Sequence, residues 1–203
     1  MFTENEIATL IEIPAVAAPT AAMKERFIQK EAQLLEISDH DFLALVMMTP
    51  AVGIALANGS VSLFEELALN KMARKMSKGG YFLKLDPVVH SMKYLIKRFD
   101  DWEGPFYEVI KASMKATFDK DKIMEAIDSS TPPSLTQFSR DLMNVPYIFV
   151  RFLSLFFLQD EVEIVEVRSI SKVEFAKVQD IGEKLDLDKF HVFQSFCHTF
   201  EVK

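Results

Sequence analysis

This chain of 203 residues contains one cysteine, six glycines and eight prolines, and each scarcity excludes a class of protein. The single thiol, Cys197, excludes an internal disulfide framework and favours a reducing compartment. So few glycines and prolines disfavour an all-β fold with many turns. The N-terminal segment carries acids where a secretory leader needs basic residues. We therefore expect a cytoplasmic protein without an export signal.

The chain also lacks the short motifs that mark common enzymes and cofactor sites. No P-loop, GxGxxG fingerprint, nucleophile elbow, CxxC pair or HExxH helix occurs in it. Aromatic residues are not interleaved with basic ones, as an RNA-binding platform requires. No apolar run reaches the roughly 20 residues that cross a bilayer. The sequence therefore favours a non-enzymatic protein and predicts no catalytic residues, metal, cofactor, nucleic-acid partner or transmembrane segment.

Apolar residues, by contrast, are abundant: hydrophobic types make up 49% of the chain, with 18 Phe and 10 Met, which is enough for a large core. They are densest in residues 145–158, where only Arg151 and Ser154 interrupt the run. Spacing of i, i+3, i+4 and i+7 places four of them on one helix face, namely Phe149, Phe152, Leu153 and Phe156. We predict a buried central helix over about 145–158, capped by Asn144 and surrounded by other helices.

Capping signals divide the rest of the chain into short helices. Thr3, Ser62 and Ser171 each precede a glutamate by three residues, which is the pattern of a capping box. Proline in a first helical turn indicates three further helix starts, at Thr49-Pro50, Asp86-Pro87 and Gly104-Pro105. The small, alanine-rich stretch 15–22 is interpreted as a flexible connector. Together these signals predict an all-α, multi-helix bundle of about eleven or twelve short helices.

The clearest break in the chain is the Ser/Thr/Pro-rich stretch 129–134, which is a candidate hinge. The simplest organisation is a single all-α domain over 1–203, and a subdivision into 1–128 and 134–203 is the alternative. Residues 160–168 are ambiguous, because their valines and isoleucine favour either a strand or a distorted helix end.

One segment recurs at an offset of 109 residues: Ser60 to Glu65 is echoed by Ser169 to Glu174. The match continues through four apolar or small positions, pairing Leu69 with Val178, Met72 with Ile181, Ala73 with Gly182, and Met76 with Leu185. Two explanations stay open at this point. The segments descend from a duplicated ancestor, or two capped amphipathic helices simply share the same chemistry.

The segment Ala55 to Glu65 resembles the "ADG-x-hydrophobic-S-x-x-E" signature of TerB-like domains, the helical tellurite-resistance module. The resemblance covers residues 55–76 and, in a second copy without the Asp-Gly pair, 169–185. It implies an all-α fold of two TerB-like halves and an accessory or stress-linked role without defined catalysis. Acidic residues near the family's signature are associated with metal ions. Here Asn58 stands in the place of the aspartate, so the resemblance carries over no metal site.

Basic residues cluster between Lys71 and Arg98, where the local charge is +7 in a chain of net charge -7. Four of them repeat at i, i+3, i+4 and i+7 and share one helix face, namely Lys71, Arg74, Lys75 and Lys78. The following helix adds Lys93, Lys97 and Arg98. This surface is a candidate site for anions or a protein partner, and the alternative is an ordinary solvated face.

Arg151 is the one cation inside the apolar run, so it needs a carboxylate or carbonyl partner. A structural ion pair is one interpretation, and a ligand carboxylate anchored by Arg151 is the other.

Three functional hypotheses follow. The first is a non-enzymatic, TerB-like module that acts through a protein partner, with a homo-oligomer left open. The second is a helical protein that binds a small apolar or acidic ligand at Arg151. The third and weakest is a metal-dependent enzyme that uses His191 and His198, which are separated by one heptad. Asp39-His40-Asp41 is interpreted as helix-capping chemistry.

Overall fold

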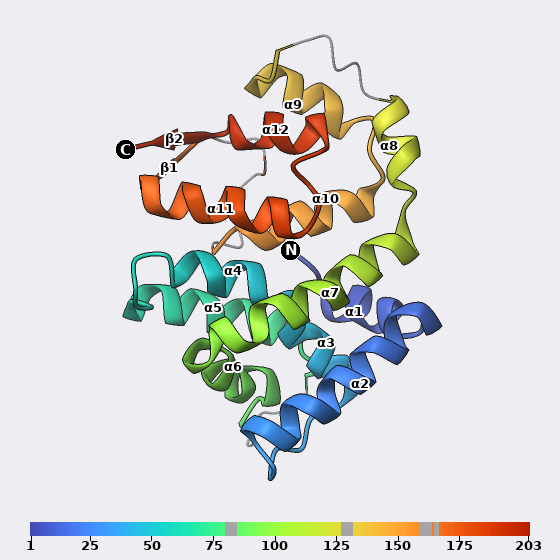
Figure 1. Ribbon diagram of the computed structural model, residues 1–203, viewed down its shortest axis with the longest axis vertical. Helices are drawn as coiled ribbons and strands as arrows, with labels where there is room; N and C mark the ends of the chain where they lie inside the picture. Colours follow the sequence, from blue (N-terminus) through green and yellow to red (C-terminus); the bar gives the residue numbers. More distant parts are fainter. Residues whose placement is uncertain (80–84, 127–131, 159–163, 165–166) are drawn as a thin grey trace.

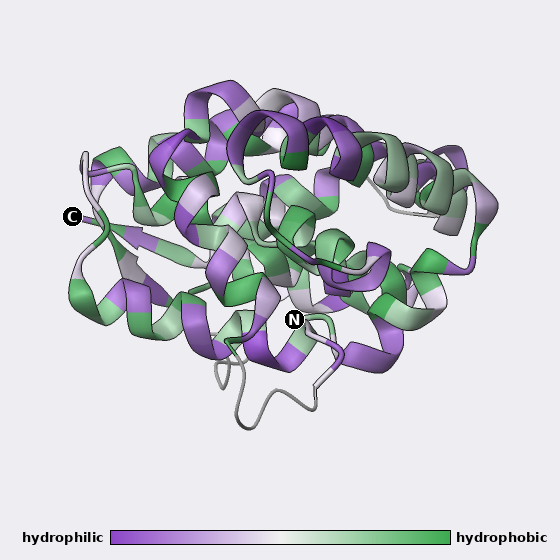
Figure 2. Cartoon of the chain, turned by 90° about the horizontal axis from the view of Figure 1, so that it is seen from below, coloured by the Kyte–Doolittle hydropathy of each residue, from purple (hydrophilic) through white to green (hydrophobic). Residues whose placement is uncertain are grey.

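The computed structural model describes residues 1–79, 85–126, 132–158, 164 and 167–203, and helices dominate them (Figure 1). In chain order the elements are α1 (Glu4–Ile11), α2 (Pro14–Glu31), α3 (Asp39–Met47), α4 (Thr49–Ala55), α5 (Leu63–Met76), α6 (Pro87–Lys97), α7 (Phe99–Thr117), α8 (Lys120–Ala126), α9 (Leu135–Leu142), α10 (Tyr147–Leu153), the 3₁₀ helix η1 (Ser154–Phe156), β1 (Arg168–Ile170), α11 (Lys172–Lys184), α12 (His191–Cys197) and β2 (Phe200–Val202). Hydrophobic and hydrophilic residues alternate along most helices, as expected where each helix buries one face (Figure 2). The predicted all-α, multi-helix bundle is confirmed.

The consecutive helices α3 and α4 form the most buried part of the described chain. All residues of α4 are buried, and so are all residues of α3 after Asp39. α1, α2, α5, α6 and α7 pack against α3, while α5, α7 and α11 pack against α4. The close approach to α4 depends on Gly53, because a Cβ atom there would lie 2.9 Å from Cζ of Phe99 and 3.3 Å from Cδ1 of Ile181.

The predicted central helix exists in shortened form and lies beside this centre. It comprises α10 and η1, and all four residues of its predicted apolar face, Phe149, Phe152, Leu153 and Phe156, are buried. Asn144 does not cap it: Pro146 occupies the N-cap position, and Nδ2 of Asn144 donates to the carbonyl oxygen of Arg140 at 3.1 Å. The cap prediction was wrong because the preceding helix end offers Asn144 an acceptor within its own turn.

Two predictions about proline were also wrong. The stretch 15–22, expected as a connector, is part of α2, where Pro19 lies inside the helix and Val16 and Thr20 are buried. Alanine has the highest helix propensity of any residue, and burial of Val16 stabilises the helix further. Gly104-Pro105 does not start a helix but lies within α7, which begins at Phe99.

Thr49 does not cap α4 with its side chain. Its hydroxyl donates to the carbonyl oxygen of Val46 at 2.6 Å, and Met48 occupies the N-cap position. Pro50, which has no N–H group, sits in the first turn of α4 as expected.

The only strands among the described residues are β1 and β2, which pair in parallel with Arg168 opposite Phe200. β1 begins at the last residue of the ambiguous stretch 160–168, most of which lies outside the described residues. The proposed hinge at 129–134 is likewise described only from residue 132 onward, where Ser134 caps α9. The division of the chain into 1–128 and 134–203 stays a prediction.

The two related segments form α5 and α11, and each begins with the predicted capping box. The backbone N–H of Ser62 donates to Oε2 of Glu65 at 2.7 Å, and that of Ser171 donates to Oε2 of Glu174 at 2.9 Å. At every one of the four paired core positions, both residues are buried. Both helices pack against α4. Shared descent and shared helix chemistry would each produce this match.

Gly182 of α11 allows a close contact with Phe193 of α12, and this generates a prediction. A Cβ atom on Gly182 would lie 2.3 Å from the ring of Phe193. That ring is 3% exposed and packs against Phe156 and Phe196, so it cannot move aside easily. We expect Gly182→Ala to lower the free energy of unfolding by about 1–3 kcal/mol, measured by urea titration.

A double-mutant cycle with Phe193→Leu tests the cause. The smaller leucine side chain should relieve the clash with the new methyl group. Phe193→Leu should therefore lower the free energy of unfolding by at least about 1 kcal/mol less in the Gly182→Ala background than in the natural chain. Stabilisation by Gly182→Ala, as at an open helix position, would contradict the close contact.

Candidate functional site

The predicted cationic face of α5 is exposed to solvent. Lys71, Arg74 and Lys75 lie on the side of the helix opposite its buried residues, which are Leu69, Met72, Ala73 and Met76. Lys78 is also exposed, but it lies beyond the end of α5, and its backbone N–H donates to Oδ1 of Asp41 at 2.8 Å. Three of the four predicted cations therefore share one helix face, and the fourth extends the positive charge past the helix end.

The same face of α5 carries three large apolar side chains near its start. Leu63, Phe64 and Leu67 are 69%, 84% and 58% exposed. At 100° per residue they occupy the same third of the helix circumference as the three cations. We call these six residues the α5 stripe: Leu63, Phe64, Leu67, Lys71, Arg74 and Lys75. The sequence analysis missed the three apolar residues of the stripe. The i, i+4 spacing of Leu63 and Leu67, on the helix face that lacks the core residues, is the signal that indicates them.

The remaining predicted cations belong to α6, which packs against α5. Lys93 and Lys97 are exposed on α6. Arg98 follows the helix, and its Nε donates to Oδ2 of Asp101 at 2.6 Å. The positive surface is therefore spread over two adjacent helices, and Arg98 is already engaged in a local ion pair.

Arg151 forms a structural ion pair, which is one of the two interpretations given above. Its Nε donates to Oε1 of Glu6 at 2.7 Å, and its guanidinium lies 4.7 Å from the ring centroid of Tyr147. The other carboxylate oxygen of Glu6 accepts from the backbone N–H of Thr3 at 2.7 Å in the α1 capping box. One carboxylate therefore closes the start of α1 and joins it to α10. The role of Arg151 as a ligand anchor stays a prediction.

The Glu6–Arg151 pair has a signature in the pH dependence of stability. Burial acts to raise the pKa of Glu6, but hydrogen bonds from Thr3 and Arg151 outweigh it and lower the pKa overall. A carboxyl group with a lower pKa in the folded state stabilises the fold above its unfolded pKa, about 4.3, and this stability is lost as the pH falls through the folded pKa.

We therefore expect Glu6→Gln to lower the free energy of unfolding by about 1–2 kcal/mol at pH 7. The difference from the natural chain should shrink between about pH 5 and pH 3, because the natural carboxylate is then protonated too. Urea unfolding at a series of pH values measures it. Arg151→Met, which leaves the Thr3 cap in place, should show the same pH trend. A penalty that is constant across this range would contradict the pair.

His191 belongs to a buried polar cluster rather than to a metal site. Its Nδ1 lies 3.2 Å from Oδ2 of Asp141, a carboxylate that is 2% exposed and also accepts from Gln137 and Ser195. The hydroxyl of Ser195 donates to the carboxylate of Asp141 and not to the imidazole of His191, and Ser195 is fully buried. Asp141, His191 and Ser195 are therefore not arranged as a catalytic triad. The cluster joins α9 to α12.

His198 lies apart from His191, and its Nδ1 donates to the carbonyl oxygen of Gln194 at 2.9 Å. Within the described part of the chain, no three His, Cys, Asp or Glu side chains are grouped so that they could hold a metal ion. Asp39-His40-Asp41 serves helix packing: Ser38 caps α3, and the fully buried Asp41 accepts from Ser38 and from the backbone of Lys78.

A charged network joins α7 to α11 across the surface. The carboxylate of Glu103 accepts from Nζ of Lys177 at 3.2 Å and from Nζ of Lys184 at 3.0 Å, and both lysines also bind Asp180. Burial acts to raise the pKa of Asp180, but the hydrogen bonds from Lys184 and Lys177 outweigh it and lower the pKa.

Tyr107 lies one turn along α7 from Glu103 and is 1% exposed. Its hydroxyl makes no hydrogen bond to any described residue. Burial, reinforced by the charges of Glu103 and Asp180, raises the pKa of Tyr107 far above its usual range, so the phenol is neutral. An unpaired buried hydroxyl destabilises the fold by its lost hydration.

We therefore expect Tyr107→Phe to raise the free energy of unfolding by about 1 kcal/mol, because the phenylalanine ring fills the same space without a hydroxyl to desolvate. Thermal and urea unfolding measure this difference, with near-ultraviolet circular dichroism as the check that the packing is retained. A loss of stability would show instead that the hydroxyl has a partner in solution.

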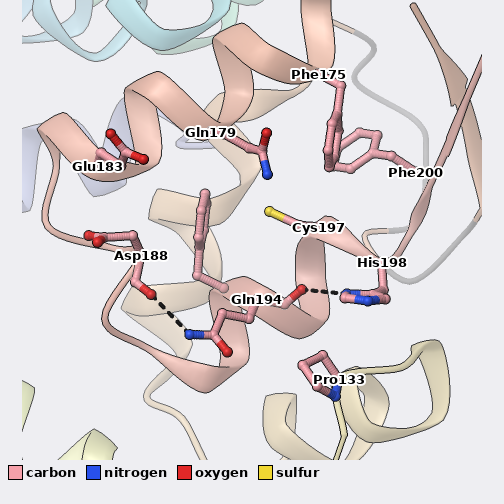
Figure 3. Close-up of a pocket in the computed structure, with 10 residues that line it drawn as sticks. Pro133, Phe175, Gln179, Glu183, Asp188, Gln194, Cys197, His198 and Phe200 are labelled. Carbon is pink, nitrogen blue, oxygen red and sulfur yellow. Dashed lines mark hydrogen bonds between the residues drawn. The ribbon is translucent and has the colours of Figure 1, made fainter. Parts of the chain in front are cut away.

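A pocket of about 590 Å³ lies between α11 and α12 (Figure 3). Its lining combines aromatic and polar side chains, namely Pro133, Phe175, Gln179, Glu183, Asp188, Phe193, Gln194, Cys197, His198 and Phe200. Asp188 does not cap α12, because Phe190 occupies the N-cap position, and the backbone carbonyl oxygen of Asp188 accepts from Nε2 of Gln194. The sequence analysis missed the pocket, since its walls come from separate elements.

No protein-family model matches this chain, and no curated protein or solved structure resembles it closely enough to identify a relative. The TerB-like resemblance of residues 55–76 and 169–185 therefore stays a prediction. Among the described residues, no single helix is long and apolar enough to cross a membrane; α1 and α2 reach that length and composition only as a pair, bent by 97° at the break between them.

Proposed function

We propose that this chain is a non-enzymatic interaction module that binds an acidic, partly apolar segment of a partner protein along the α5 stripe. The observation that supports this most is the order of residues in the stripe: three exposed apolar side chains precede three cations on one helix face. Exposed apolar residues grouped in this way are typical of binding surfaces. The adjoining cations would select and orient an acidic partner.

A protein segment fits this surface better than a nucleic acid or an anionic membrane. The chain has a net charge of -7, and the parts outside residues 71–98 are strongly acidic, so an extended polyanion would be repelled. From Leu63 to Lys75 the stripe is about 18 Å long, which matches a single short helix of a partner. The TerB-like resemblance supports an accessory or stress-linked role, and the single cysteine supports a cytoplasmic one.

Charge reversal on the stripe tests the proposal. We expect Lys71→Glu combined with Arg74→Glu to weaken binding of the partner at least tenfold, because two attractive contacts become repulsive. The matched control is Lys122→Glu with Lys172→Glu, which changes the net charge equally on α8 and α11. Affinity purification with quantitative mass spectrometry identifies proteins lost from the first variant and kept by the control, and titration with the purified protein confirms direct binding.

The apolar half of the stripe is tested separately with Phe64→Ser. This side chain is 84% exposed, so its replacement should leave thermal stability almost unchanged. A partner that binds along the stripe should also be lost from this variant. If both stripe variants keep the same set of bound proteins as the natural chain, the proposed docking surface is wrong.

A further inference from the structure

The pocket between α11 and α12 has an apolar end and an acidic end, both visible in Figure 3. Its residues are distinct from those of the α5 stripe, so the inference below does not rest on the proposed partner binding. A pocket of about 590 Å³ lies within the range that holds small organic molecules.

The apolar end is built from aromatic rings and a neutral thiol. The ring centroids of Phe175 and Phe200 are 6.1 Å apart, and the buried ring of Phe193 also lines the pocket. Burial raises the pKa of Cys197 to about 12, so its thiol is uncharged at neutral pH and behaves as part of the apolar wall. This end fits a hydrocarbon or aromatic group.

The acidic end is formed by Glu183, near the end of α11, and Asp188, in the segment that leads to α12. Neither carboxylate makes a hydrogen bond or an ion pair with another described residue. The two nearby lysines make their ion pairs with other residues, since Lys184 binds Glu103 and Asp180 while Lys189 binds Asp186 and interacts with Asp188 only through its charge. The C-terminal end of α11 adds partial negative charge at the same place.

Hydrogen bonds along α12 fix the rim between the two ends. The amide of Gln194 donates to the backbone carbonyl of Asp188 at 3.2 Å, and the imidazole of His198 donates to the carbonyl oxygen of Gln194 at 2.9 Å. Both contacts are drawn in Figure 3. They hold the loop that carries Asp188 against α12, so the acidic end keeps its position relative to the ring of Phe193 in that helix.

We propose that this pocket binds a small primary amine with an aromatic or aliphatic body. The ammonium group would lie between Glu183 and Asp188, and the body would lie over Phe193 and extend toward Phe175 and Phe200. No lysine or arginine lines the pocket, so a carboxylate placed at the acidic end would be repelled by Glu183 and Asp188. The ligand class is thus opposite in charge to the acidic ligand expected at Arg151.

Three probes that share a phenylethyl body test the charge preference: 2-phenylethylamine, the neutral 2-phenylethanol and the anion 3-phenylpropionate. We expect the purified chain to bind the amine about tenfold more tightly than the alcohol, because only the amine forms ion pairs with the two carboxylates. A tenfold ratio of dissociation constants corresponds to about 1.4 kcal/mol of binding free energy. The carboxylate should not bind measurably. Titration followed by amide chemical shifts in nuclear magnetic resonance measures affinity and shows whether residues 175–200 respond.

The variant Glu183→Gln with Asp188→Asn removes both charges while keeping the side-chain shapes. It should reduce amine affinity to that of the alcohol and leave alcohol binding unchanged. The matched control, Glu12→Gln with Glu25→Gln, neutralises two exposed carboxylates, one just after α1 and one in α2, and should change neither value. Thermal unfolding checks that every variant is folded.

The proposal is overturned by any of three results. The amine and the alcohol bind equally well, the Glu183→Gln and Asp188→Asn variant keeps full amine affinity, or no probe shifts the signals of residues 175–200. These outcomes are independent of the partner-binding experiment, because the α5 stripe is unchanged in all of these variants.

Discussion

Burial of α4, and of α3 after Asp39, is the constraint on which the rest of the molecule depends. A segment enclosed on all sides must pair its backbone groups internally, and its small residues must let neighbours approach closely. Gly53 meets the second requirement, because Phe99 of α7 and Ile181 of α11 occupy the space that a side chain there would fill. The helices that pack on this centre commit one face to it and leave the opposite face for solvent. The exposure of the α5 stripe follows directly, since Leu69 and Met72 hold the other face inward.

Buried charges follow from the same packing. Polar groups enclosed between packed helices need hydrogen-bond partners, and buried carboxylates supply them. Asp41 in α3 accepts the backbone N–H of Lys78 beyond α5, and Asp141 in α9 binds His191 and Ser195 in α12. Acid, histidine and serine therefore occur together in this chain at a contact that joins two helices.

The sequence predicted the structure correctly where neighbouring residues determine it. Predictions failed where contacts between distant segments determine the structure. The capping boxes at Ser62 and Ser171 and the core positions of the helices behind them depend on residues within a few turns, so all were predicted. Residues 15–22 were misjudged because helix propensity and tertiary burial outweigh one internal proline. The partner of Arg151 lies 145 residues away in sequence, and the pocket brings together α11, α12 and β2. No local pattern reports such contacts.

The two related helices connect both proposed surfaces. At the offset of 109 residues the buried positions of α5 and α11 keep their character, but two outward positions carry opposite charges in the two helices. Lys71 corresponds to Asp180, and Arg74 corresponds to Glu183. Both helices pack against α4, so their buried positions must stay apolar or small, whichever origin the two segments have. The outer faces are free of that requirement, so they can differ at little cost in stability. The cationic stripe of α5 and the acidic pocket end of α11 lie at these unconstrained positions, where differences in binding can arise without altering the fold.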